Sequence, residues 1–385
     1  MYKSYKYRIY PNKEQRNLIV RHFGACRWVY NYGLQRKIET YQQTGKGISK
    51  FEISKELPSL KKKEETKWLN EINSQSLQSS LENLDKAFTK FFKEKKGFPK
   101  FKSKKNNRKS FCIPQSFVID FNSNKIKIPK CKTWIKTKID RNIEGKIKQA
   151  TILQTPTGKY FVSILVEIDK EFPESKPISE NQAIGVDLGI KTFATLSDGI
   201  EIKNPRNLKN SLGRLKKLQR QFSRKKKGSN NRDKVRKKVA ILHEKVSNQR
   251  HDFLHKTTYF LVKNYDTICL ETLKPKNMMK NHCLAQALSD IAIGTFNQFI
   301  EYKAKWHGSN ILRIGQFEPS SKMCGCGFVN SDLKLSDRMW TCKNCGTTND
   351  RDLLAARNIK RFAFSKNKTT AGHAESYACG DMSSH

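Results

Sequence analysis

Three acidic residues stand at the ends of apolar segments in a chain that is otherwise strongly basic. Residues 184–186 lead into Asp187, residues 268–270 lead into Glu271, and Asp352 opens a third apolar segment. A carboxylate at the end of a buried strand is costly to desolvate unless a cation neutralises it. Three carboxylates that converge from distant parts of a chain are the ligands that a two-metal phosphodiester-cleaving site requires. Oxygen ligands favour Mg²⁺ or Mn²⁺ over zinc.

The same residues also have a purely structural interpretation. Asp187 could cap a turn before Gly189, and either Asp350 or Asp352 could be the N-cap of a helix that begins there. Solvated acidic residues are common at strand ends. The pattern therefore suggests a metal site, and Asp350 remains the alternative to Asp352 as its third carboxylate.

The net charge narrows the classes of partner. The 385 residues include 76 Lys and Arg against 35 Asp and Glu, which gives a formal net charge of +41. The basic residues are spread through the chain, and this favours binding to a polyanion, above all nucleic acid. Between positions 203 and 238 the only acidic residue is Asp233. In that segment we expect Arg214, Lys217 and Arg224 to contact phosphates.

Four cysteines have the grouping of a zinc ribbon. Cys342 and Cys345 are separated by two residues and followed by a glycine, so both thiolates can reach one metal ion. Cys324 and Cys326 are separated by one residue only, and this shorter spacing strains simultaneous ligation. We therefore expect a structural zinc site to which Cys324 contributes less than Cys345. A metal-free loop with free thiols is the alternative.

Two histidines four residues apart, His251 and His255, imitate the metal-binding motif of zinc proteases. In that motif a glutamate follows the first histidine as general base, and here Asp252 stands in its place. The flanking cations Arg250 and Lys256 disfavour a bound dication. Packing or contact with RNA is therefore the preferred interpretation of the pair.

The N-terminal half combines helices with short strands. Alternation predicts a strand over residues 5–10, and the pattern from 14 to about 96 is helical. Residues 111–168 form short β-rich segments between turns, which predicts a small antiparallel barrel or sandwich, and 167–181 has the composition of a linker. The clearest helix begins after Asn73 and carries an apolar stripe that we expect to be core, namely Leu77, Leu81, Leu84, Phe88 and Phe91.

The C-terminal half alternates strands and helices. Residues 183–196 predict two strands broken at Gly189, like the opening hairpin of an RNase H-type sheet, and 267–270 predict a further strand. A long basic helical stretch lies between them, and 289–306 predicts an amphipathic helix. This alternation predicts an α/β layer.

The chain has no segment that approaches the roughly 18 apolar residues of a membrane span. Its N-terminal residues contain no apolar signal core. We therefore expect a cytoplasmic protein, associated with the nucleoid in a bacterium. In that compartment the ten cysteines argue against a disulfide framework, and the clustered ones favour metal binding.

Several motifs in a fixed order resemble the TnpB (OrfB) family, which are transposon-encoded RNA-guided endonucleases similar to the type V CRISPR effectors. These are residues 185–191, then 270–273, then the cysteine ribbon that leads into 350–352. Residues 5–11, 97–102, 320–322 and 378–380 also match, so the resemblance covers nearly the whole chain. The chain departs from the family pattern at the short Cys324–Cys326 spacing and at Leu354, where the family usually has Asn.

The resemblance implies a bilobed, multidomain α+β protein. Its recognition lobe would be a small wedge-like β-barrel with a helical insertion, and its nuclease lobe a RuvC-like RNase H α/β fold interrupted by the zinc ribbon. The implied boundaries are 1–10 and 110–180 for the wedge, 11–109 for the helical recognition domain, 181–318 and 350–364 for the nuclease domain, 319–349 for the ribbon and 365–385 for a disordered tail.

The resemblance also implies the activity and the partners. The protein would be a metal-dependent DNA endonuclease in which Asp187, Glu271 and Asp352 hold Mg²⁺ or Mn²⁺, and the four cysteines hold zinc. A transposon-derived guide RNA, bound to a protein monomer, would select double-stranded DNA beside a short flanking motif. The alternatives are an RNA-guided DNA-binding protein without cleavage, an RNase H-fold DNA transposase, and a zinc-ribbon nucleic-acid factor.

Overall fold

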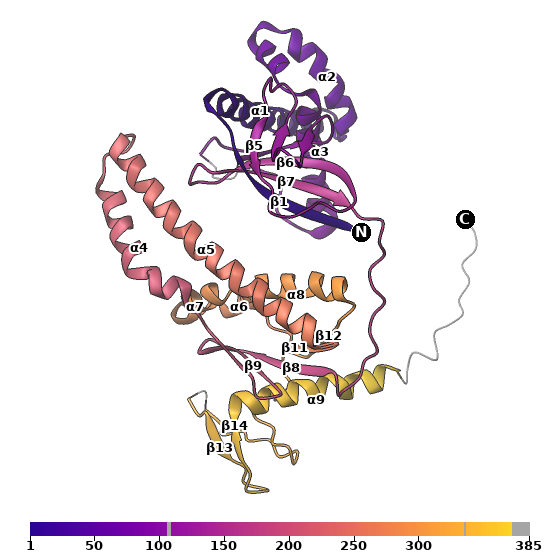
Figure 1. Cartoon of the computed structure of the whole chain (residues 1–385), viewed down its shortest axis with the longest axis vertical. Helices are drawn as coiled ribbons and strands as arrows, with labels where there is room; N and C mark the ends of the chain where they lie inside the picture. Colours follow the sequence, from indigo (N-terminus) through magenta and orange to yellow (C-terminus); the bar gives the residue numbers. More distant parts are fainter. Residues whose placement is uncertain (106–108, 335, 372–385) are drawn as a thin grey trace, which may run out of the picture. The chain divides into compact units, whose positions relative to one another are not determined.

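The computed structural model describes residues 1–105, 109–334 and 336–371. The chain divides after Glu171 into two compact units. Both contain helices and strands, which confirms the predicted α+β class (Figure 1). Among the described helices, none is long and apolar enough to cross a membrane. Most of the predicted C-terminal tail, including residues 378–380, lies outside the described residues.

The first unit contains one antiparallel sheet in the order β2-β6-β7-β1-β5-β4-β3. The antiparallel strands that the sequence predicts here all belong to this one sheet. In the central pair, Tyr5 faces Ile164 and Tyr7 faces Val162, and all four are buried. The strands are β1 (Tyr2–Tyr10), β2 (Lys109–Ile113), β3 (Val118–Asp120), β4 (Lys125–Lys127), β5 (Ile135–Lys138), β6 (Lys146–Gln154) and β7 (Tyr160–Glu167).

The helices of the first unit share one hydrophobic core with this sheet. They are α1 (Lys13–Thr44), α2 (Lys50–Lys62), the 3-10 helix η1 (Glu64–Glu71) and α3 (Ser74–Glu94). The Asn73 side chain caps α3 as the sequence predicts. Leu77, Leu81 and Leu84 of the predicted stripe are buried, which confirms their core role, but Phe88 and Phe91 are only half-buried.

The second unit contains a mixed sheet in the order β10-β9-β8-β11-β12. Strand β8 pairs in parallel with β11, which pairs in parallel with β12, whereas β9 and β10 are antiparallel. The predicted hairpin at Gly189 is therefore present as β8 and β9. The strands are β8 (Ala183–Leu188), β9 (Thr192–Leu196), β10 (Glu201–Lys203), β11 (Thr267–Glu271) and β12 (Asn310–Ile314).

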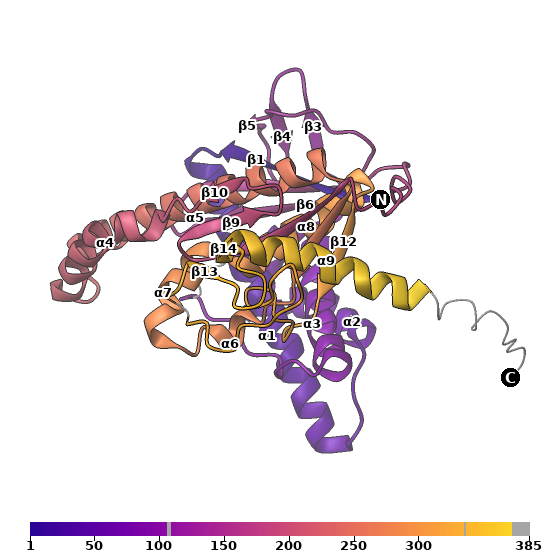
Figure 2. The ribbon, with the colours of Figure 1, turned by 90° about the horizontal axis from the view of Figure 1, so that it is seen from below.

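The two faces of this sheet are covered by different helices (Figure 1, Figure 2). Ile268 and Leu270 of β11 join a buried cluster with residues of α5 and α8, whereas Cys269 between them joins a cluster with residues of α9. This alternation follows from the two-residue period of a strand. The helices are α4 (Asn207–Arg224), α5 (Asn230–Asn264), α6 (Pro275–Met278), α7 (His282–Ile291), α8 (Ile293–His307) and α9 (Arg351–Ala371).

Two helices expected to be continuous are interrupted. The basic stretch over 203–238 bends back on itself, because Gly228 with φ of 83° lies between α4 and α5. The helix expected over 289–306 is split into α7 and α8 at Ala292, whose φ is 54°. A small ribbon precedes α9, formed by the antiparallel pair β13 (Met339–Thr341) and β14 (Thr348–Asp350).

Candidate active site and cysteine cluster

Two of the predicted carboxylates lie side by side at one edge of the mixed sheet. Val186 of β8 and Leu270 of β11 are directly paired in a parallel register, and each is followed by an acidic residue. Parallel strands end at the same edge, so Asp187 and Glu271 reach that edge together. Both side chains are half-buried.

Helix α9 brings the third carboxylate to the same place because it packs very closely on β8. A Cβ atom added to Gly185 would lie 2.0 Å from the carbonyl oxygen of Ala356. Only glycine permits this approach, and the small residues Ala355 and Ala356 are buried on the contacting side. Asp352, in the first turn of α9, is thereby held near the ends of β8 and β11.

Asp350 and Asp352 have different partners. One oxygen of Asp350, Oδ1, accepts hydrogen bonds from the backbone N–H groups of Asp352 and Leu353, both at 2.9 Å. This is the geometry of an N-cap. Asp352 instead receives two hydrogen bonds from one guanidinium nitrogen of Arg338, Nη1, at 2.7 and 2.9 Å. The structural interpretation therefore applies to Asp350, and Asp352 is the aspartate turned toward other charged groups.

Glu271 is held by residues that sequence reasoning did not assign to the site. The Ser320 hydroxyl donates to its Oε1 at 3.0 Å. The buried amide of Asn358 in α9 donates in turn to the carbonyl oxygens of Ser320 and Met323, at 2.7 and 2.6 Å. The sequence signal for Asn358 is a polar residue on the apolar face of a helix, and the signal for Ser320 is only its place in the motif 320–322. Arg338 carries no such signal.

The electrostatics of the site are those of crowded carboxylates. Burial, and after it the charges of Glu271 and Asp352, raise the pKa of Asp187 to about 7 against the opposing charges of Arg351 and Arg338. Burial also raises the pKa of Glu271. The ionised forms of these groups are therefore disfavoured without a cation. Carboxylates that bind a divalent ion have this property, because the ion offsets their burial and mutual repulsion.

The donor set fits a divalent cation that prefers oxygen ligands. Among the described residues, however, the four cysteines alone form a cluster whose ligand atoms all lie within 4.8 Å of one another. The three carboxylates interact electrostatically but do not lie as close to one another as the four cysteines do. Asp352 also forms an ion pair with Arg338. A bound cation would have to compete with that guanidinium.

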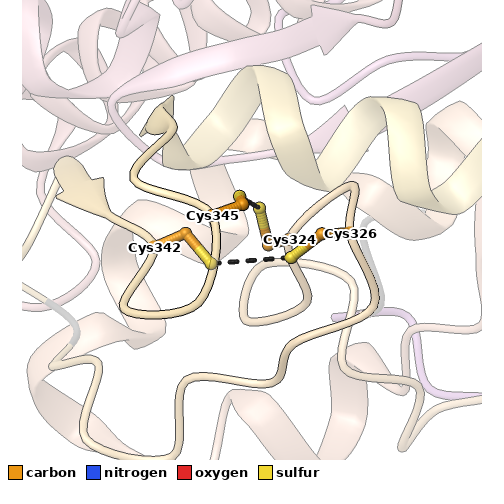
Figure 3. Close-up of side chains that lie close together, drawn as sticks. All are labelled: Cys324, Cys326, Cys342 and Cys345. Carbon is orange, nitrogen blue, oxygen red and sulfur yellow. Dashed lines mark hydrogen bonds between the residues drawn. The ribbon is translucent and has the colours of Figure 1, made fainter.

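The four predicted zinc ligands converge (Figure 3). The sulfur of Cys324 lies 3.6 Å from that of Cys345, and the sulfur of Cys326 lies 3.6 Å from that of Cys342. The short Cys324–Cys326 spacing therefore does not keep its two thiols away from the other pair. Every cysteine in the described part of the chain is free of disulfide bonds.

The ribbon environment supports thiolate ligands. Hydrogen bonds from Thr347 are the main cause that lowers the pKa of Cys345 to about 6. The Asn349 and Asn344 amides each lie 3.6 Å from a cysteine sulfur, those of Cys324 and Cys326 respectively. Leu354, where the family pattern has Asn, is buried in a small apolar cluster with Cys324, Trp340 and neighbouring residues. Its place is in the ribbon core.

The histidine pair and the basic residues expected to contact phosphates lie on different helices of the second unit. The ring of His255 stacks on Phe299 with 4.0 Å between centroids and an angle of 13°, so this part of the histidine pair is a packing contact. Arg214, Lys217 and Arg224 are exposed along α4, the helix that pairs with α5 (Figure 1).

Three family models match parts of the chain. Residues 163–282 match a model described as "Probable transposase", and residues 294–359 match the Cas12f1-like TNB domain. Residues 1–46 match a model described as a helix-turn-helix domain. In the structure this last segment is the strand β1 and the single helix α1.

Relatives match over nearly the full length. A protein of Streptomyces pristinaespiralis is 37% identical over 98% of this chain and 91% of its own length. A protein of Escherichia coli K12, InsQ, is 32% identical over 98% of this chain and 94% of its own length. Both carry the name "Putative RNA-guided DNA endonuclease". The chain belongs to the TnpB (OrfB) family, which is related to the type V CRISPR effectors, as its motifs predict.

A solved structure also aligns with the chain. The cryo-EM structure of a Cas12f1 complex with its single guide RNA and target DNA aligns with a TM-score of 0.49 and 14% identity. The alignment covers 94% of this chain and 98% of the other.

Proposed function

We propose that this protein is an RNA-guided DNA endonuclease that cleaves guide-complementary DNA beside a short flanking motif. The observation that carries the proposal is the meeting of Asp187, Glu271 and Asp352 at one end of the mixed sheet, where Asp187 feels the charges of the other two. The two full-length relatives named above support the RNA-guided part of the assignment.

The strand order supports an RNase H-type core of the RuvC kind. Three antiparallel strands followed by two parallel ones, in the order β10-β9-β8-β11-β12, present the carboxylates at the ends of the central pair. We assign residues 181–318 and 350–364 to this nuclease domain and 319–349 to the ribbon. The seven-stranded sheet supports a wedge-like domain from 1–10 and 110–180, with the helices of 11–109 inserted as a recognition domain.

In this proposal Asp187, Glu271 and Asp352 would hold Mg²⁺ or Mn²⁺, which would supply charge stabilisation and an activated water for phosphodiester hydrolysis. The chain's own residues prepare the site. The Ser320 hydroxyl fixes one oxygen of Glu271, and Asn358 fixes the backbone around Ser320. Arg338 forms an ion pair with Asp352. The ribbon would hold one zinc ion in a structural role, because four thiolates leave no open position.

Two alternatives remain distinct from this proposal. An RNA-guided binder without cleavage would bind guide and target but cut neither strand. An RNase H-fold transposase would bind transposon ends without RNA. Three observations decide between them: whether RNA co-purifies with the protein, to which locus that RNA maps, and whether a target matching it is cut in Mg²⁺.

We also propose that α4 binds nucleic acid and that Arg214, Lys217 and Arg224 contact its phosphates. Neutralising these three residues should flatten the salt dependence of the affinity for nucleic acid.

A further inference from the structure

The first unit has an aromatic hollow that the proposed cleavage does not use. It lies between the C-terminal parts of α1 and α3 and has a volume of about 610 Å³. We call it the phenylalanine groove and define it by its aromatic and aliphatic lining: Ile38, Tyr41, Ile48, Phe88, Phe91, Phe92 and Phe98.

The rings of the groove form a connected cluster. Phe98 meets Phe88 and Phe91 edge to face, with centroids 5.5 and 5.4 Å apart and angles of 89° and 84°. Phe92 contacts Phe88 and Phe91 at 6.2 and 5.0 Å. The segment after α3 therefore folds back, and Phe98 fixes the far end of the helix. The cluster is preorganised, since its rings hold one another.

Much of this aromatic surface is left open to solvent. Phe92 is 71% exposed, Tyr41 64% and Phe98 47%. The apolar stripe of α3 is thus buried at Leu77, Leu81 and Leu84 but lies at the surface in the last two turns of the helix. A contiguous exposed aromatic surface of this kind is typical of an interaction site.

Lysines line and flank the groove, and their positive charge favours an anionic chain as its ligand. Lys37 and Lys93 line it, and the ammonium of Lys37 lies 5.2 Å from the centre of the Phe88 ring. Asp85 is the acidic residue of the lining, and it lies 3.8 Å from Lys37. Exposed lysines also follow one another along the end of α3 and beyond it, at positions 90, 93, 95 and 96.

We propose that the phenylalanine groove binds unpaired nucleobases of single-stranded RNA, with the surrounding lysines contacting the flanking phosphates. Aromatic faces stack on bases whatever their sequence, and cations beside them track the backbone. An apolar protein segment would use the rings but would gain nothing from the lysines. The choice of RNA over other strands rests on the proposed function, in which RNA is the resident partner.

The test compares two exposed phenylalanines of the first unit. Phe92→Ala removes the most exposed ring of the groove, and Phe51→Ala removes a ring of α2 that is 70% exposed and also lies beneath a lysine, Lys50, at 5.2 Å. Binding of a short fluorescent oligouridine to RNA-free protein is measured by anisotropy. Phe92→Ala should weaken binding about tenfold or more, whereas Phe51→Ala should leave it unchanged and Phe92→Trp should restore it.

A second probe separates stacking from charge. An oligonucleotide of the same length with abasic positions should bind the parent and Phe92→Ala equally, because no base is left to stack. Equal oligouridine affinity of Phe92→Ala and parent, or equal losses in both alanine variants, overturns the inference while leaving RNA binding as such intact. A parent that binds no RNA at all would instead overturn the proposed function. Preference for the matching oligodeoxynucleotide, or loss of self-association in Phe92→Ala, would assign the groove to another occupant.

Discussion

At the scale of single residues, the pKa of Asp187 makes the site's charge measurable without any substrate. The folded carboxyl keeps its proton up to about pH 7, whereas in the unfolded chain it loses it near the ordinary pKa of 3.8. Between these values the folded state binds more protons, so the free energy of unfolding falls as pH rises. In metal-free buffer Asp187→Asn should escape this fall and gain on the order of a few kcal/mol over the parent by neutral pH.

The measurement is urea denaturation of both proteins in chelator at a series of pH values. Asp233→Asn, which removes an exposed negative charge from α5 in the same unit, is the control for net charge. A difference between Asp187→Asn and parent that stays constant with pH would mean that the carboxyl is ionised throughout, and that the three carboxylates do not repel one another.

Arg338 provides a second test at this scale. Its guanidinium makes two hydrogen bonds to Asp352, so it competes with any cation for that carboxylate. Arg338→Ala should lower the free energy of unfolding of the metal-free protein by about 1 kcal/mol, seen as a slightly lower thermal midpoint. It should also raise the affinity for Mn²⁺ several-fold in a calorimetric titration. Lys343→Ala breaks the exposed pair with Asp332 in the same ribbon and should change neither affinity nor, beyond a few tenths, stability.

Weaker Mn²⁺ binding by Arg338→Ala would contradict this account. It would mean that Arg338 organises Asp352 for the cation, because removal of a mere competitor cannot reduce affinity.

The candidate site was predictable from sequence only in part. Asp187 and Glu271 end apolar strands, a pattern that can be read along the chain. The choice of Asp352 over Asp350 came from the family pattern, and the N-cap bonds of Asp350 agree with it. The contacts of Ser320 and Asn358 could not be predicted, because they join residues that meet only after the ribbon folds against α9.

At the scale of secondary structure, the packing of α9 on β8 is the element contact on which the site depends. Gly185→Ala would place a methyl group against the Ala356 carbonyl, so α9 must move and Asp352 with it. We expect a loss of about 1–3 kcal/mol in the free energy of unfolding and a loss of DNA cleavage. Gly213→Ala in α4 meets no atom within 4 Å and should instead stabilise by about 0.5–1 kcal/mol. Parent-like stability and cleavage of Gly185→Ala would refute the close contact.

The cysteine ribbon gives the other prediction at this scale. Because all four sulfurs converge, Cys324→Ser and Cys345→Ser should each sharply reduce zinc content by elemental analysis and lower the thermal midpoint. Cys283→Ser, an exposed cysteine outside the cluster, is the control. Retention of zinc by Cys324→Ser would restore the expectation drawn from the short spacing, that its thiol is held out of the site.

Strands were easier to predict than helix ends. Strands β8 and β9 each contain a run of four consecutive buried residues, and a glycine lies at the turn between them. The break at Gly228 falls in a Gly-Ser-Asn run, which is a turn signal, whereas Ala292 lies inside a segment with helical patterning and a left-handed alanine gives no local signal. The last two turns of α3 were expected to be core because the apolar period continues there, whereas in the structure they line the surface groove.

At the scale of the whole molecule, the central claim is that guided DNA cleavage depends on the three carboxylates. The measurement is cleavage of a matching target by the protein with its co-purified RNA in Mg²⁺. Asp187→Ala, Glu271→Ala and Asp352→Ala should each abolish cutting while RNA and target binding persist. Asp350→Ala, which removes only a helix cap worth about 1 kcal/mol, should still cut. If Asp187→Ala cuts at the parent's rate, the cleavage does not belong to this site and the account is wrong.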